Sequence, residues 1–350
     1  MKPAATSIER VLTTLGHREP DRVPLFLLLS LHGARELGLP IREYFRSPRH
    51  VVEGQARLQA RYGHDCYNAF FYAAIEMEAW GGETRFFEDG PPNAGEPIVS
   101  RAGQIAGLSP PRVAECARLR QVLEAVAGLR EKAAGEVPVI GVVVSPYSLP
   151  VMQLGFERYL DWQIETPEAI ERLWRINQEF CVEWANAQLQ AGATAICYFD
   201  PLASPTITPP EVYRATGWRI AQRTLARIAG PTATHLASGR SLAIANLLAQ
   251  TGTAAIGVSA LEDLAEVKRA FAGRVGVIGN LNGIEMARWT PAEAETAVRD
   301  AIARAAPGGG FILADNHGEI PWQVSGDTLM AISEAARKWG EYPLPGRDGT

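Results

Sequence analysis

The chain has 350 residues, of which 47% are hydrophobic, 21% charged and 8% aromatic. This composition excludes a disordered, collagen-like or coiled-coil protein, and the length suits either two domains or one α/β barrel. The formal charge of −5 and the lack of a Lys/Arg run argue against nucleic acid as the main partner.

The start of the chain and its cysteines indicate in which cellular compartment the protein works. The first residues are polar and lack the apolar core of a signal peptide, and no apolar stretch reaches the ~18 residues that a membrane span requires. No CxxC pair occurs among the four cysteines, Cys66, Cys116, Cys181 and Cys197. We therefore expect buried thiols in a cytoplasmic protein without a membrane partner.

Eight short apolar runs follow one another along the chain. Each is bounded by Gly, Pro or polar residues, and most are followed by a segment of helical periodicity. Their near-continuous apolar character is typical of parallel strands that are covered on both faces. The eight runs are 23–29, 66–71, 138–144, 193–200, 232–237, 254–259, 274–280 and 310–315.

The helices between these runs have recognisable start signals. Thr166, followed by proline, predicts a long helix that reaches about Gln190, since Thr is a good N-cap and Pro suits the first turn. The same Thr-Pro pattern predicts helices from Thr290 and from Thr208. The last helix is predicted from Ser325 to about Gly340, where glycine suits a C-cap.

Eight strands with helical crossovers predict a closed (β/α)8 TIM barrel of the α/β class, as one domain over residues 1–350. The alternative is a doubly wound open sheet, but no strand is followed by a GxGxxG loop. Residues 81–111, after the second strand, are too many for an ordinary connection. We expect an excursion there, in which 83–87 and 97–101 pair as a hairpin.

In such a barrel, polar residues at the carboxyl ends of the strands form the active site. His235 lies near the end of strand five, His317 follows strand eight and Asp200 ends strand four, so these three are the candidate catalytic groups. Histidine titrates near neutral pH and suits acid–base work. Structural roles stay open, because Asp200 precedes a proline turn and His235 lies among small residues. The candidate substrate-binding residues at the strand ends are Glu78, Tyr147, Tyr198, Arg240, Asn280 and Asn316.

Several segments resemble the uroporphyrinogen decarboxylase superfamily, and their order and spacing extend over almost the whole chain. This resemblance implies a TIM barrel and two competing activities, decarboxylation and corrinoid-linked methyl transfer. The segments are Ile8–Leu12, Pro20–Pro24, Glu78–Gly81, Ala191–Pro201, Phe311–Pro321 and Ala335–Gly340.

The chain shares one motif with the decarboxylase branch and lacks two others. His317-Gly318 resembles the decarboxylase's His-Gly, but the Arg-Gln-Ala-Gly-Arg signature after the first strand is absent, and Tyr72 stands nearest to the family's Asp. Burying the carboxylates of uroporphyrinogen without arginine partners is costly. Only Arg35 and Arg240 are obvious cations near the strand ends.

The methyltransferase branch resembles the chain more closely overall. The resemblance implies zinc held by a His-x-Cys pair after strand five and a Cys after strand eight, where zinc activates an acceptor thiol. Here those places read His235-Leu236-Ala237 and Asn316-His317-Gly318, without cysteine. A zinc site of His235, His317 and a carboxylate such as Asp200 or Glu319 stays open, as does a metal-free reaction with a histidine general acid.

Three functions are therefore weighed. The first is methyl transfer between a small methylated donor and a corrinoid that a partner protein carries. The second is decarboxylation of uroporphyrinogen or a smaller acid, and the third is a non-catalytic barrel that binds a tetrapyrrole. A homo-oligomer is also compatible with the sequence. For the two histidines to act in one reaction, His235 and His317 must meet at the same end of the barrel, and we expect that they do.

Overall fold

Seven parallel strands form a curled sheet in the computed structural model, which describes residues 5–344. The order in the sheet is β1-β4-β5-β6-β7-β8-β9, and each strand pairs in parallel with the next. This confirms the predicted α/β class and TIM-barrel-like architecture. The strands are β1 (Tyr67–Asn68), β4 (Val139–Val144), β5 (Ala195–Phe199), β6 (Thr232–His235), β7 (Ala255–Gly257), β8 (Gly276–Leu281) and β9 (Phe311–Asp315).

The segment 23–29, predicted as the first strand, closes the sheet without being a regular strand. It makes a single parallel bridge, Leu25 to Leu313. The Phe26 N–H donates to the Leu313 carbonyl (2.8 Å), and the Asp65 N–H donates to the Leu25 carbonyl (2.7 Å). The segment therefore lies between β9 and the residues before β1, but Pro24 has no N–H to continue a ladder. The prediction of eight regular strands is wrong at this position.

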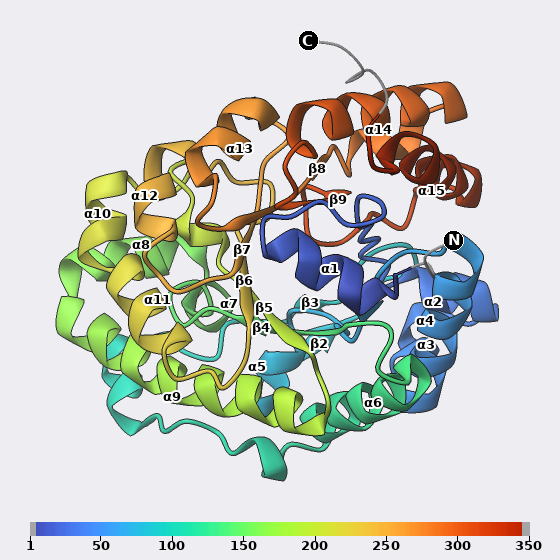
Figure 1. Cartoon of the computed structure of the whole chain (residues 1–350). Helices are drawn as coiled ribbons and strands as arrows, with labels where there is room; N and C mark the ends of the chain where they lie inside the picture. Colours follow the sequence, from blue (N-terminus) through green and yellow to red (C-terminus); the bar gives the residue numbers. More distant parts are fainter. Residues whose placement is uncertain (1–4, 345–350) are drawn as a thin grey trace.

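Helices cover the outside of the sheet and one end of the barrel (Figure 1). Helix α1 lies at the amino-terminal ends of the strands, where Val11 packs with Phe26, Ile278 and Ile312. The long helices are α1 (Ser7–Leu15), α4 (Pro48–Tyr62), α6 (Ala117–Ala133), α8 (Phe156–Glu165), α9 (Pro167–Ala191), α11 (Gly217–Leu225), α13 (Leu264–Phe271), α14 (Pro291–Ala305) and α15 (Gly326–Gly340). The short ones are α2 (His32–Leu37), α3 (Ile41–Tyr44), α5 (Ile75–Ala79), α7 (Pro150–Leu154), α10 (Pro210–Ala215) and α12 (Ala245–Leu248). Over residues 5–344, none of these helices has the length and apolar character that crossing a membrane demands.

Most predicted helix starts are correct. Thr166, Thr290 and Ser325 occupy the N-cap positions of α9, α14 and α15. The helix predicted from Thr208 instead begins at Pro210, with Pro209 at the N-cap position. The reason is local, since Thr208 already donates its N–H to the Ser204 carbonyl in the preceding turn.

The excursion after β1 contains a hairpin that is shorter than predicted. Strand β2 (Thr84–Arg85) pairs antiparallel with β3 (Asn93–Ala94). The predicted second arm, 97–101, does not take part, because Val99 is buried against other residues and donates its N–H to the Gln153 carbonyl. A tertiary contact therefore overrides the pairing that the apolar pattern indicated.

Candidate functional site

His235, at the carboxyl end of β6, is held as a neutral imidazole. The Ala237 N–H donates to its Nδ1 (3.0 Å), which leaves the ring hydrogen on Nε2. Burial, together with nearby His317, lowers the pKa of His235 to about 4. Its Nε2 has no hydrogen-bond partner within residues 5–344. A buried donor without a partner is costly, so this N–H is free to bind an acceptor on a ligand.

Two glycines and an aromatic ring fix the His235 imidazole. A Cβ at Gly257 would lie 2.2 Å from its Cδ2, and one at Gly318 would lie 3.1 Å from its Cε1. Phe199 stacks on the imidazole with 6.1 Å between ring centroids. Larger residues at 257 or 318 would displace the ring, which gives the His317-Gly318 pair a steric explanation.

His317 lies in the loop after β9 and is exposed. Its Nδ1 is 2.8 Å from the Ser238 Oγ, in the loop after β6. Its backbone N–H and that of Gly318 donate to one oxygen of Asp315 (2.7 and 2.9 Å), which fixes the turn. The structure therefore brings His235 and His317 together at the same end of the barrel.

Asp200 is fully buried beside these groups. Its N–H donates to the His235 carbonyl (2.8 Å), and its Oδ1 accepts from Ser145 Oγ and Ser148 Oγ (2.6 Å each). Its Oδ2 has no partner among the described side chains. Burial raises the pKa of Asp200 to about 6. This carboxyl group holds the loop after β4 against the loop after β5.

Two further carboxyl groups lie at the end of β9 and in the loop after it. Glu319 accepts from Ser30 Oγ, and burial raises its pKa to about 7, with a further rise from Asp315. Burial also raises the pKa of Asp315. From the sequence, Glu319 was expected as a possible metal ligand, although its place after the last strand also fits a wider role.

The side chains of three predicted substrate-binding residues make other contacts. Side chains alternate along a strand, so Tyr198 faces outward and packs with Phe180 and Cys181 of α9. Tyr147 is buried against Trp174. Glu78 accepts from Tyr72 and Thr84 (2.9 and 2.8 Å) and pairs with Arg118 (3.3 Å) in a separate polar cluster.

The remaining three predicted residues lie at the rim. The Asn280 side chain donates to the Ser259 carbonyl (3.0 Å), and the Asn316 side chain accepts from the Gly283 N–H (3.0 Å). Both amides therefore hold loops in place. Arg240 is exposed, and its backbone carbonyl accepts from Ser204 Oγ (3.0 Å).

Arg35, the other cation near the strand ends, is already engaged. Its guanidinium donates to the backbone carbonyls of Val324 (2.9 Å) and Trp322 and lies 4.2 Å from the centre of the Trp322 ring. Beside it, His32 is buried, and neither of its ring nitrogens has a hydrogen-bond partner among residues 5–344. Burial lowers the pKa of His32 to about 3. Arg35 is therefore not available to pair with a substrate carboxylate.

A zinc ion does not fit these residues. Within the described part of the chain, no three His, Cys, Asp or Glu side chains are grouped to hold a metal ion. The Ala237 N–H uses the Nδ1 lone pair of His235 and leaves the hydrogen on Nε2, so neither nitrogen offers a lone pair to a metal. The first expected cysteine is replaced by Ala237, and the stretch Asn316-His317-Gly318 holds no cysteine.

Comparison with known proteins places the chain in the same family that the sequence motifs indicate. The family model described as uroporphyrinogen decarboxylase (URO-D) matches residues 6–339. The methylcobamide:CoM methyltransferase MtaA of Methanosarcina barkeri is 30% identical over 200 residues, which are 55% of this chain and 59% of that protein. A uroporphyrinogen decarboxylase of Idiomarina loihiensis is 26% identical over 97% of this chain and 98% of its own length.

A solved structure supports the fold. A methyltransferase from Methanosarcina mazei superimposes with a TM-score of 0.86, over 95% of this chain and 99% of that one. The sequence identity is 21%, so this likeness concerns the fold alone.

Proposed function

The chain belongs to the uroporphyrinogen decarboxylase family, and on that premise we propose that it transfers a methyl group between a small methylated donor and a corrinoid carried by a partner protein. The relatives named above are enzymes, either methyltransferases or decarboxylases. The name of the Methanosarcina barkeri relative, a methylcobamide methyltransferase, supports the first activity. That match spans only 59% of the relative's length, so its activity enters here as a proposal.

The observation that carries the proposal is the charge of the groups at the barrel mouth. Asp200 and Asp315 are buried carboxyl groups and Glu319 is a half-buried one, and Arg35 is bound to backbone carbonyls. A substrate with several carboxylates would meet these acidic groups there, and of the two cations near the strand ends only the exposed Arg240 would be left to offset its charge. An uncharged methylated donor avoids this cost.

Methyl transfer breaks the bond between a heteroatom and a methyl carbon, and the electron pair stays on the heteroatom. The corrinoid, as second substrate, supplies the cobalt centre that takes or gives the methyl group. The His235 Nε2–H, which has no protein partner among the described residues, donates a hydrogen bond to the heteroatom and orients it. His317, held by Ser238 at the rim, supplies the proton that the departing heteroatom needs.

Asp200 has a positioning role in this scheme. Its contacts with Ser145 and Ser148, and the bond from its N–H to the His235 carbonyl, hold the backbone around the imidazole. We expect Asp200 to act through His235 without touching the donor.

The test uses the purified full chain with reduced cobalamin and a panel of methanol, dimethyl sulfide and anisole. We expect the methylcobalamin spectrum with at least one donor, and a loss of rate of 100-fold or more in His317→Ala, the scale of general acid catalysis. His50→Gln, at a histidine whose ring Nδ1–H donates to the nearby Glu43 carbonyl, is the control. No methylcobalamin with any donor would overturn the proposal.

Decarboxylation is the second candidate, because the similarity to the Idiomarina loihiensis decarboxylase extends over the full length of both chains. Release of carbon dioxide from uroporphyrinogen, without methylcobalamin formation, would support it. Tight binding of a tetrapyrrole without either reaction would support a non-catalytic barrel.

A further inference from the structure

The interior of the barrel is hollow. A cavity of about 130 Å³ lies between α1 and His235. The inside of a (β/α)8 barrel is normally filled by bulky branched side chains. Here several of the lining positions on β5, β6 and β7 carry small residues, namely Ala195, Cys197, Ala233, Ala255 and Gly257.

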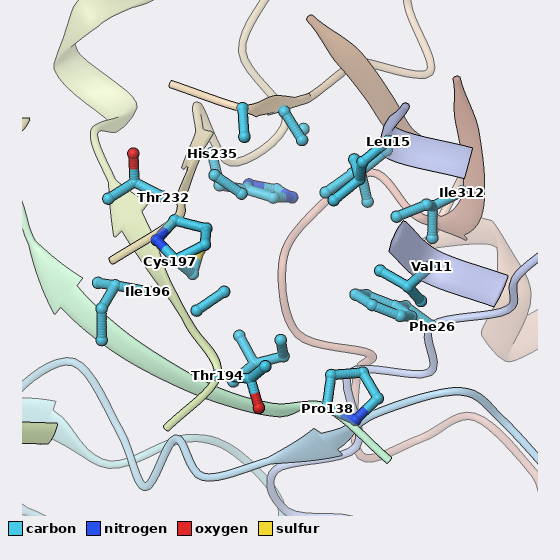
Figure 2. Close-up of a pocket in the computed structure, with 18 of the residues that line it drawn as sticks. Val11, Leu15, Phe26, Pro138, Thr194, Ile196, Cys197, Thr232, His235 and Ile312 are labelled. Carbon is cyan, nitrogen blue, oxygen red and sulfur yellow. The ribbon is translucent and has the colours of Figure 1, made fainter. Parts of the chain in front are cut away.

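The walls of the cavity are almost entirely hydrocarbon. Figure 2 shows Val11 and Leu15 of α1, with Phe26 and Ile312, opposite the side chains of β5 and β6. Burial raises the pKa of the Cys197 thiol to about 12, so this side chain is uncharged. A water molecule needs two to four polar partners to be held in a cavity, and these walls do not supply them.

One polar group points into this space. The His235 imidazole extends from the end of β6 toward the cavity (Figure 2), and the residue is only 4% exposed. Its Nε2–H has no partner among the described residues. The glycines at 257 and 318 keep the ring in this orientation. An apolar cavity that ends at one unsatisfied donor suits an apolar ligand with one acceptor.

We propose that the barrel interior binds a small, uncharged, apolar molecule or substituent of about the size of benzene, whose single hydrogen-bond acceptor meets the Nε2–H of His235. Apolar cavities of about 150 Å³ bind benzene, so the volume fits. The proposal deepens the proposed function, on which it rests for its biological meaning, because it names the class of group attached to the heteroatom. Binding itself is measured without methyl transfer.

The experiment measures binding of benzene and pyridine to the full chain at pH 8, by calorimetry and by the shift in Tm that a ligand of the folded state produces. The two rings have nearly the same shape, and only pyridine carries an acceptor. We expect both to bind. His235→Phe should raise the Kd of pyridine about fivefold, the effect of one net hydrogen bond, and leave that of benzene nearly unchanged.

Cavity-filling variants give the second arm. Ala233→Leu should abolish binding of both probes, whereas Ala303→Leu, on the exposed side of α14, should bind as the unmodified chain does. Circular dichroism checks folding, and Ala255→Val is the milder substitution if Ala233→Leu misfolds. Failure of both probes to bind, or undiminished binding by a folded cavity-filling variant, would overturn the proposal.

The two proposals fail separately. Binding of benzene and pyridine without methylcobalamin formation from any donor would support the cavity site and contradict methyl transfer. Methyl transfer from methanol, with no probe bound, would support the activity and contradict the cavity site.

Discussion

The chemistry available to His235 is set by its neighbour two residues along the chain. Ala237 has a positive φ of 51°, which is unfavourable for a residue with a Cβ and directs its N–H to the His235 Nδ1. The imidazole is thereby fixed as a neutral donor on Nε2. This one backbone contact both excludes the zinc ligation that the family resemblance implied and creates the donor that the two proposals use.

The first prediction concerns this tautomer. In ¹⁵N NMR spectra of the histidine rings, His235 should remain neutral between pH 5 and 8, with its hydrogen on Nε2, because burial lowers its pKa to about 4. His50→Gln removes another ring signal and helps the assignment. A His235 ring that titrates near pH 6.5, or that carries its hydrogen on Nδ1, would contradict this prediction.

The second prediction concerns Glu76, a fully buried carboxyl group on α5. Its Oε1 accepts from the Val144 N–H (2.8 Å), and burial raises its pKa from 4.5 to about 8. The folded state therefore holds a proton that the unfolded state has released between these pH values. The free energy of unfolding should fall as pH rises through this window.

Glu76→Gln keeps an acceptor for Val144 but removes this titration. We expect the variant to gain on the order of 3 kcal/mol over the unmodified chain at pH 9, and little or nothing at pH 4. Urea unfolding at several pH values measures the difference. A constant difference over the whole range would show that Glu76 does not titrate as described.

At the residue scale, the sequence placed candidate residues at strand ends but did not give the direction of each side chain. His235, His317 and Asp200 were found from their positions after apolar runs. Tyr198 has the same kind of position, yet the alternation along β5 turns it toward α9. The partners that hold Glu319 and Asp200 come from distant loops, so no local pattern could have named Ser30 or Ser145.

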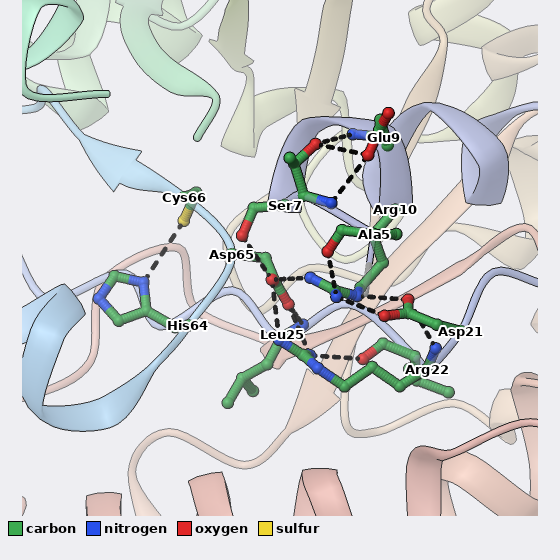
Figure 3. Close-up of polar contacts among 12 residues, drawn as sticks. Ala5, Ser7, Glu9, Arg10, Asp21, Arg22, Leu25, His64, Asp65 and Cys66 are labelled. Carbon is green, nitrogen blue, oxygen red and sulfur yellow. Dashed lines mark hydrogen bonds and ion pairs between the residues drawn. The ribbon is translucent and has the colours of Figure 1, made fainter. Parts of the chain in front are cut away.

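At the scale of elements, the amino-terminal segment is held by a buried ion network (Figure 3). Asp65 pairs with Arg10 and Arg22 (2.7 Å each), and Arg10 also pairs with Asp21 (2.6 Å). Asp65 further accepts from the Leu25 N–H (2.9 Å). The network ties α1 and the segment 23–29 to the residues before β1. It gives a physical reason for the charged residues among Ile8–Leu12 and Pro20–Pro24.

The third prediction removes the centre of this network. Asp65→Asn removes the buried carboxylate that Arg10 and Arg22 share and leaves Arg10 paired with Asp21 alone, and we expect it to cost about 3–5 kcal/mol of unfolding free energy. Glu53→Gln, which removes the exposed Glu53–Arg57 pair, is the matched control and should cost less than about 1 kcal/mol. Equal losses in the two variants, by urea unfolding, would contradict a special role for Asp65.

Elements whose signals are local were predicted well from the sequence, and those that depend on distant contacts were not. The caps of α9, α14 and α15 depend on a few neighbouring residues, and their starts are correct. The second arm of the hairpin was misplaced because Val99 bonds to Gln153, over fifty positions away. The irregularity of the segment 23–29 likewise depends on its neighbours β9 and Asp65.

At the scale of the whole molecule, the order of apolar runs predicted the barrel. It predicted neither the cavity in its interior nor the place where the pairing between neighbouring strands is sparse. Small residues occur in many strands, and only the closed arrangement shows that those of β5, β6 and β7 face one space with α1 across it. In the same way, the amount of pairing between neighbouring strands is a property of the closed sheet. Both features follow from geometry that a linear pattern does not contain.

The barrel should open first where its pairing is thinnest. Strands β4 and β5 are paired over five positions, whereas β1 is paired with β4 over two and the segment 23–29 bridges β9 at one. Local openings expose the amides that have the least surrounding structure. In the fourth prediction, amides of 23–29 and 66–71 exchange with deuterium sooner than those of β5 and β8, as measured by mass spectrometry of the native protein.

Because Asp65 joins the two sides of this closure, Asp65→Asn should speed exchange there more than in β5, whereas Glu53→Gln should leave the pattern unchanged. Uniform exchange over all strands, or an equal acceleration everywhere in Asp65→Asn, would mean that the sheet opens as one unit and that Asp65 does not specifically hold its closure.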